Sequence, residues 1–249
     1  MTLETAEDLE KLKKIGYIVA KTIKLMKNSI ESGMTTKELD DIGRKYLELE
    51  GAKSAPELVY NFPGATCISI NESVAHGIPN STIIRDGDMV NIDVSAELDG
   101  YFADSGSSFI VPPSNDLKKN LIKATKQALN KAIDEVKAGV FVNIIGKTIE
   151  KQARKAGFSI IRDLGSHGVG RHLHEEPKFI APFYDKNDKR VLKEGMVITI
   201  EPFLSTGAEY VFQDRDGWTL KTDKRYITAQ FEHTMVITKN KPILITVCD

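Results

Sequence analysis

The chain has 249 residues, of which 41% are hydrophobic and 28% charged, a composition typical of a soluble globular protein with a sizeable core. Its 34 basic and 35 acidic residues nearly balance, which excludes a global positive field for nucleic acid or anionic lipid and favours small molecules and peptides as partners. The two cysteines form no CxxC pair, and no apolar run has the length of a signal peptide or a membrane span, so we expect a cytoplasmic protein without membrane contact.

Two amphipathic helices are predicted near the N-terminus. Apolar residues recur at spacings of three and four within residues 5–30, and again within residues 35–49. Each segment opens with a capping box, in which a threonine is followed three residues later by an acid: Thr5 and Asp8, and Thr35 and Glu38. Glycines at positions 33 and 51 are expected to end the two helices.

Residues 54–80 have the composition of loops, with three prolines, two glycines and one short strand, CISI. His76 lies here, in the sequence HGIP. A histidine placed in a loop between glycine and proline is a candidate functional residue.

A β-hairpin is predicted next, and it carries two carboxylates. Asp93 ends the apolar run MVNIDV, Asp104 opens ADSGSSFIV, and the turn signal Asp99-Gly100 separates the two runs. Pairing of the strands would bring Asp93 and Asp104 to neighbouring positions. Two carboxylates that close must be protonated, paired with a base or neutralised by a cation.

After the polar break VPPSND the pattern starts again. Residues 116–138 form another amphipathic segment, and a further glycine-bounded segment follows it. Its glycines are 157 − 139 = 18 residues apart, as are those of the first half at 51 − 33 = 18. Three further landmarks recur in the same order: HxxP at His76 and His174, an acid six residues after a glycine at Asp93 and Glu201, and an acid before an apolar strand at Asp104 and Glu232. We interpret the chain as one domain, residues 1–249, of two structural half-repeats, at about 5–111 and 115–247.

The repeat predicts that four carboxylates meet. If the halves pack about a pseudo-twofold axis, Asp93 and Asp104 face Glu201 and Glu232. Burying these groups without counter-charge would cost more than the net stability of a domain, so the arrangement requires bound cations. A pair of divalent metals that share bridging carboxylates meets this requirement.

His167 is the fifth candidate ligand, because it is enclosed by glycines in LGSHGVGRHLHEEP. One imidazole with four carboxylates suits Mn²⁺, Fe²⁺, Co²⁺ or Zn²⁺ better than Ca²⁺ or Mg²⁺. Other motifs fail: the glycines do not match GxGxxG, Lys178 stands where HExxH needs its second histidine, and no GxSxG is present.

Together these residues resemble the type I methionine aminopeptidases. CISIN, HGIP, NIDV, DGYFAD, GSHGVG, HEEP, ITIEP and FEHT match that family in order over essentially the whole chain. The resemblance implies an α+β pita-bread fold, with a central antiparallel sheet backed by helices. It also implies a cytoplasmic enzyme, expected to be monomeric, that uses two divalent ions and removes methionine from peptide N-termini, including nascent chains at the ribosome, when the second residue is small.

The resemblance also assigns roles. Asp104 and Glu232 would bridge the two metals, Asp93 would hold one of them, and His167 with Glu201 would hold the other. The residues that match the family's substrate-facing histidines are His76 and His174. His174 would donate to the carbonyl oxygen, His76 would contact the amide nitrogen, and Glu201 would carry the proton of the metal-activated water to the leaving amine.

Three positions depart from the family's pattern: Ser166, His172 and Leu173. They leave the ligand set intact. Leu173 neighbours His174, and with Phe62, Cys67 and Trp218 it would form an apolar pocket for a methionine side chain.

Three alternatives to this assignment can be compared with the sequence. An X-Pro aminopeptidase or prolidase shares the fold but carries a large additional N-terminal domain, whereas the first repeat here begins within ten residues of Met1. A non-catalytic pita-bread binding protein would have lost metal ligands, and this chain keeps all five. A type II methionine aminopeptidase would need a long insertion between the last two acidic ligands, which 232 − 201 = 31 residues cannot hold.

Overall fold

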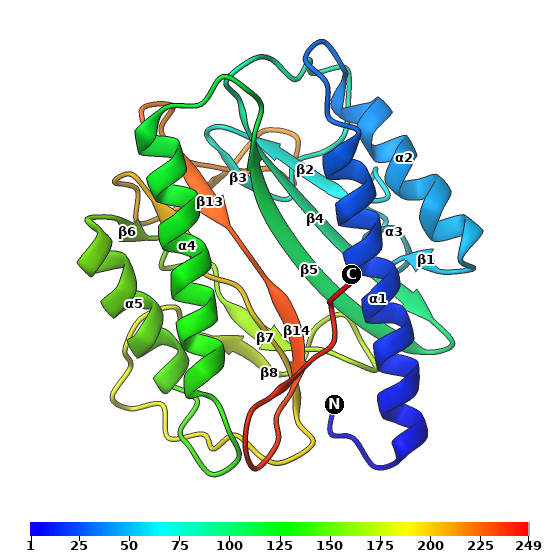
Figure 1. Ribbon diagram of the computed structural model, residues 1–249, viewed down its shortest axis with the longest axis vertical. Helices are drawn as coiled ribbons and strands as arrows, with labels where there is room; N and C mark the ends of the chain where they lie inside the picture. Colours follow the sequence, from blue (N-terminus) through cyan, green and yellow to red (C-terminus); the bar gives the residue numbers. More distant parts are fainter. Residues whose placement is uncertain (249) are drawn as a thin grey trace.

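Helices flank a set of antiparallel strands in the computed structural model, which describes residues 1–248 (Figure 1). In this view, two long helices from the first half of the chain lie to the right of the central strands and two from the second half lie to the left. The helices are α1 (Ala6–Asn28), α2 (Thr36–Leu49), α3 (Ala55–Tyr60), α4 (Asp116–Glu135) and α5 (Ile144–Ala156). The predicted α+β class with antiparallel sheets is confirmed.

Both predicted capping boxes are present at the starts of α1 and α2. Two helix ends differ from the prediction. α1 ends before residue 30 because its last turn tightens: the Ser29 N–H is shared between Leu25 O and Met26 O, and the Ile30 N–H donates to Lys27 O three residues back. α4 ends before residue 138 because Val136 turns into an extended conformation and is buried. The region 54–80 also contains a helix that was not predicted, α3.

The predicted hairpin joins β4 (Met89–Leu98) to β5 (Tyr101–Ile110). Asp99 and Gly100 both have positive φ, 54° and 79°, as a two-residue type I′ turn requires. Asp93 pairs with Gly106 and Asp104 pairs with Ser95, so the two carboxylates are diagonal neighbours on one face.

The remaining strands form small antiparallel sheets around this hairpin. β4 also pairs with β1 (Lys53–Ser54) and β2 (Cys67–Ile70). A five-stranded sheet has the order β15 (Ile243–Leu244), β14 (His233–Val236), β9 (Val197–Ile200), β7 (Ser166–Gly168) and β8 (Glu175–Ile180). Two three-stranded sheets complete the set: β13 (Thr228–Gln230), β10 (Phe203–Ser205) and β6 (Ser159–Ile160), and β11 (Phe212–Gln213), β12 (Leu220–Lys221) and β3 (Ser73–Ala75).

The two halves of the chain meet along a seam, defined here as residues 104–108 against residues 230–234. Glu232 N donates to Gly106 O at 2.9 Å, and the Ser105 hydroxyl donates to Glu232 O at 2.7 Å. The Thr234 hydroxyl donates to Asp104 O at 2.8 Å. Asp104 and Glu232 therefore lie side by side although they are far apart in the sequence.

Each half has its own apolar core between helices and strands. α1 and α2 pack Leu12, Ile15 and Leu39 against Ile92 of β4. In the second half, Leu121 and Ile145 belong to the core that α4 and α5 cover. In each half the helices thus pack on one face of the strands. The opposite face is left for the site.

Backbone hydrogen bonds recur at matching positions of the two halves. Gly33 N donates to Ile84 O and Gly139 N to Leu192 O, both at 2.8 Å. Gly87 N donates to Val111 O at 2.9 Å, and Gly195 N to Ile237 O at 2.8 Å. The division into half-repeats within one domain remains our prediction. Among residues 1–248, no helix is both long enough and apolar enough to cross a membrane.

Candidate metal centre and active-site cavity

A cavity of about 410 Å³ opens at the seam. All of the residues that the sequence singled out as ligands, substrate-facing histidines or pocket walls line it: Phe62, Cys67, His76, Asp93, Asp104, His167, Leu173, His174, Glu201, Trp218 and Glu232. The structure thus brings the whole predicted set together.

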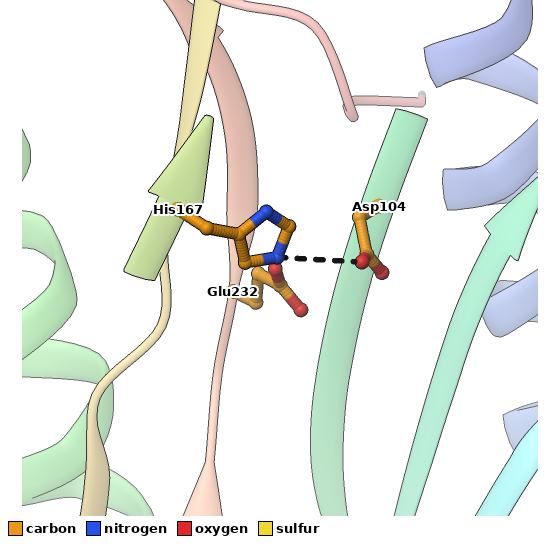
Figure 2. A group of neighbouring side chains, drawn as sticks. All are labelled: Asp104, His167 and Glu232. Atoms are coloured by element: carbon orange, nitrogen blue, oxygen red, sulfur yellow. Dashed lines mark ion pairs between the residues drawn. The ribbon is translucent and has the colours of Figure 1, made fainter. Parts of the chain in front are cut away.

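Asp104, His167 and Glu232 form the centre of this set (Figure 2). One ligand atom from each lies within 4.8 Å of the others, and all three side chains are buried. His167 Nε2 is 3.8 Å from Asp104 Oδ2 and 3.5 Å from Glu201 Oε1. These atoms come from β5, β7, the residue after β9 and the residue before β14, so the fold converges on this point from both halves.

The orientation of His167 suits metal ligation. Its backbone N–H donates to the Thr199 hydroxyl at 3.1 Å, and its Nδ1 lies 3.0 Å from Gly168 O. A hydrogen on Nδ1 that is bound to this carbonyl leaves Nε2 as the bare nitrogen facing the carboxylates. Burial and the neighbouring His174 lower the pKa of His167 to about 3, so the ring is neutral near pH 7.

The carboxylates repel one another in a buried site. Burial raises the pKa of Asp93 to about 7. Burial and the neighbouring carboxylates also raise the pKa values of Asp104, Glu201 and Glu232 well above their ordinary range. Without a cation, the cluster can keep its charges only at a large cost.

Two oxygens at this point have no hydrogen-bond partner among the described residues. They are Asp104 Oδ1 and Glu232 Oε1, both buried. A buried carboxylate oxygen without a donor costs about 1–3 kcal/mol or more, which a coordinated cation would remove. The donor set of four carboxylates and one imidazole therefore fits divalent metal ions.

Gln230 links the two halves beneath the carboxylates. Its Nε2 donates to Asp93 Oδ2 at 3.3 Å and to Glu232 Oε2 at 3.1 Å, and its Oε1 accepts from Asn91 Nδ2 at 2.7 Å. The side chain is 1% exposed. Gln230 therefore fixes one predicted ligand from each half, and we had not predicted its role.

Ser166, which departs from the family's pattern, contacts a predicted ligand. Its hydroxyl accepts from Glu201 N at 3.0 Å, while the Thr199 hydroxyl donates to Glu201 Oε1 at 3.3 Å. The backbone and the carboxylate of Glu201 are thus held separately.

The two histidines that are predicted to face the substrate reach the cavity from different segments. His76 follows β3 and has a φ of 54°. The next residue, Gly77, is bound to β2, because Ile68 N donates to Gly77 O at 2.9 Å. His174 precedes β8, and its ring centroid is 4.1 Å from that of His167. Burial lowers the pKa of both His76 and His174 below the ordinary value.

The segment between His167 and His174 is anchored by Arg171. Its guanidinium lies 3.8 Å from the centre of the Tyr101 ring and donates to Asp8 Oδ1 at 2.8 Å. Tyr101 Oη donates to the same oxygen at 2.7 Å, and this bond lowers the pKa of Asp8 to about 2. α1 and β5 together therefore hold the histidine segment in place.

One wall of the cavity is apolar. Phe62 and Trp218 pack edge to face, with centroids 5.3 Å apart and an angle of 87°. Cys67 pairs with Asp93 across β2 and β4, and burial raises the pKa of its thiol well above the ordinary value, so the sulfur is a neutral wall. Leu173 lines the cavity and also packs into the core of the first half.

Tyr60 and Phe203 also line the cavity and were not predicted. Phe203 directly follows ITIEP in the sequence, so its closeness to Glu201 in the chain could have indicated that it lines the cavity. Tyr60 ends a six-residue helix with no amphipathic pattern, which left no signal. His233, by contrast, lies elsewhere: its Nδ1 is 3.0 Å from Thr246 Oγ1, and it lines a different cavity beside α1.

Comparison with known proteins identifies relatives over the whole chain. The sequence profile of the metallopeptidase family M24 matches residues 10–239. Methionine aminopeptidase 2 of Bacillus subtilis is 47% identical, with 99% of each chain covered. The methionine aminopeptidase of Aquifex aeolicus is 40% identical, with 98% of each covered.

Solved structures agree. The methionine aminopeptidase of Rickettsia prowazekii superposes with a TM-score of 0.94 at 35% identity, covering 99% of this chain and 100% of that one. The prolidase of Pyrococcus furiosus has the same fold, with a TM-score of 0.80, but is 23% identical, and only 66% of its length is matched.

Proposed function

Because this chain belongs to metallopeptidase family M24 and is a methionine aminopeptidase of type I with the pita-bread fold, we propose that the cavity at the seam is its active site. The observation that carries this proposal is the pair of buried carboxylate oxygens without donors, Asp104 Oδ1 and Glu232 Oε1, close to His167 Nε2. The prolidase and non-catalytic alternatives are not favoured, since full-length relatives at 40–47% identity are methionine aminopeptidases.

The enzyme uses divalent metal, and we assign its ligands. Two ions of Mn²⁺, Fe²⁺, Co²⁺ or Zn²⁺ would be held by Asp93, Asp104, His167, Glu201 and Glu232. When bound, they would polarise the scissile carbonyl and lower the pKa of water to near neutrality. They would also neutralise carboxylates whose pKa values burial raises in the metal-free protein.

Protein side chains would do the remaining work. The His174 ring is neutral near pH 7 and would donate a hydrogen bond to the carbonyl oxygen as negative charge develops there. His76, which also lines the cavity, would contact the amide nitrogen. Glu201 would take the proton from the attacking water and pass it to the leaving amine.

The apolar wall explains the choice of side chain. Phe62, Cys67 and Trp218 offer an edge-to-face ring pair and a neutral sulfur to an unbranched, polarisable methionine. Lysine or glutamate in this position would bury an unpaired charge. The second residue would have to be small, because His76 and His174 crowd the cavity beyond the scissile bond.

Partners follow from this chemistry. The enzyme acts on peptide N-termini. We propose that it works as a cytoplasmic monomer on nascent chains.

The test is a comparison of kcat/KM for Met-Ala-Ser, Met-Leu-Ser, norleucine-Ala-Ser and Lys-Ala-Ser with metal-loaded enzyme. Met-Ala-Ser should be cleaved best, with the norleucine peptide within about two orders of magnitude, because one methylene in an apolar pocket is worth roughly 1–3 kcal/mol. Equal rates for Lys-Ala-Ser and Met-Ala-Ser would refute the assignment of this wall as the specificity pocket.

A further inference from the structure

Tyr60 lines the cavity and contacts His174 directly. Its hydroxyl oxygen is 2.7 Å from His174 Nδ1, and the ring centroids are 5.9 Å apart. This distance is typical of a well-formed hydrogen bond. Since the His174 ring also lies 4.1 Å from that of His167, it is held between two neighbours.

Tyr60 is presented from an anchored helix. It is the last residue of α3, which begins with Ser54 accepting from Glu57 N at 3.3 Å. Asn61 ends the helix in the left-handed conformation. Glu57 also accepts two hydrogen bonds from the Arg44 guanidinium, at 2.9 and 2.5 Å, and these tie α3 to α2. The hydroxyl therefore has a fixed position relative to the cavity.

The direction of this hydrogen bond decides which ring nitrogen carries the hydrogen. Burial raises the pKa of Tyr60 above its ordinary value of 10, so the phenol keeps its proton near pH 7. A neutral imidazole has one N–H and one bare nitrogen. If the phenol donates to Nδ1, that nitrogen must be bare, and the ring hydrogen is on Nε2.

On the basis of the function proposed above, we propose that Tyr60 is a positioning residue: its hydroxyl donates to His174 Nδ1 and thereby keeps Nε2–H as the donor to the substrate carbonyl oxygen. In the other tautomer, Nε2 would be a bare acceptor and could not stabilise an oxyanion. The hydrogen bond also fixes the rotation of the ring. This role is the one that an orienting partner performs for a working histidine in other enzymes.

The principal test is Tyr60→Phe, which keeps the ring and removes only the hydroxyl. We expect kcat for Met-Ala-Ser to fall on the order of 10- to 100-fold, the range for loss of a partner that orients a histidine, with KM changed less than about threefold. Metal content should be unchanged. Tyr184→Phe is the matched control, because Tyr184 is about as exposed as Tyr60, 47% against 42%, but lies outside the cavity lining, and its kcat should equal that of the wild type.

Two further measurements separate positioning from a general structural effect. In a His174→Ala background, Tyr60→Phe should cost little more, because residues that act through one another are non-additive. In zinc-loaded protein with ¹⁵N-labelled histidines, His174 should show the Nε2–H tautomer in the wild type and a mixture in Tyr60→Phe. The ¹⁵N signal of His174 is identified as the one that is missing from the spectrum of His174→Ala.

The outcomes are distinct. An unchanged kcat in Tyr60→Phe, an equal loss in both backgrounds, or Nδ1–H at His174 in the wild type would each overturn the inference. If the wild type itself fails to release methionine, the proposed function fails, while the ¹⁵N spectra still decide which partner donates in the Tyr60–His174 contact.

Discussion

We expect Asp93→Asn to stabilise the metal-free protein at neutral pH while weakening metal binding. Burial raises the pKa of Asp93 to about 7, against an ordinary value of 3.8. The difference, 7 − 3.8 = 3.2, corresponds to a cost on the order of 4 kcal/mol for keeping the carboxylate ionised in the fold. Asparagine cannot ionise, so the variant avoids this cost. Its amide oxygen can still accept from Gln230 Nε2.

The effect depends on pH with a definite sign. Because the folded pKa lies above the unfolded one, the folded state binds the proton more tightly, and this contribution is present in full below about pH 3.8. It is lost as the pH rises through about 7. The stability advantage of Asp93→Asn should therefore rise from about 1.6 kcal/mol at pH 5, which is 5 − 3.8 = 1.2 pH units above the unfolded pKa, to about 4 kcal/mol near pH 8. For a chain of this size, 1 kcal/mol corresponds to roughly 2–4 °C in Tm, so the advantage should reach about 10 °C.

The assay is thermal unfolding in chelator at pH 5, 6, 7 and 8, followed by circular dichroism. Asp86→Asn is the control, because Asp86 is an exposed acid outside the cavity lining, and its Tm should follow the wild type at every pH. Adding Mn²⁺ should then reverse the order, since the wild type gains more from binding. An Asp93→Asn protein that unfolds at or below the wild-type temperature at pH 8 in chelator would refute the argument that the buried, ionised carboxylate destabilises the metal-free fold.

Three further predictions concern the metal centre and the side chains around it. Chelation should abolish activity and metal titration should restore it with up to two ions per chain, whereas full activity in chelator would contradict the ligand assignment. His174→Ala should lower kcat on the order of 10²–10³-fold with metal content unchanged, as loss of an oxyanion donor does; loss of metal with an intact per-metal rate would reassign the residue. Gln230→Leu should weaken metal affinity on the order of 10–100-fold by calorimetry, while the exposed Gln127→Leu should not.

The helices and the hairpin were predictable because local chemistry determines them. Thr5 with Asp8 forms the predicted capping box. Asp99-Gly100 forms the two-residue turn because both residues take a positive φ. Helix ends were less predictable. Val136 ends α4 and packs into the core of the second half, and the local sequence pattern does not show where this change of direction occurs.

For the site, the sequence located the candidate ligands but not what orients them. Asp93 and Glu201 could be named because each stands six residues after a glycine in its half. Gln230 was missed because it reaches Asp93 across the seam, a contact that depends on the packing of the two halves. Gly106 was the available signal: a Cβ there would lie 2.0 Å from Gln230 Oε1, so the glycine in this strand leaves room for that side chain.

The two sides of the seam are synthesised at different times. Asp104 leaves the ribosome 232 − 104 = 128 residues ahead of Glu232, which at roughly 5–20 residues per second is a delay of about 6–25 s. During that interval the first hairpin carries Asp93 and Asp104 without Glu232, and for its first 167 − 104 = 63 residues without His167 as well. On the ligand assignment proposed above, metal capture would therefore be a late event that requires both halves to have docked. A chain that stops before Glu232 would lack the carboxylate that pairs with Asp104 across the seam.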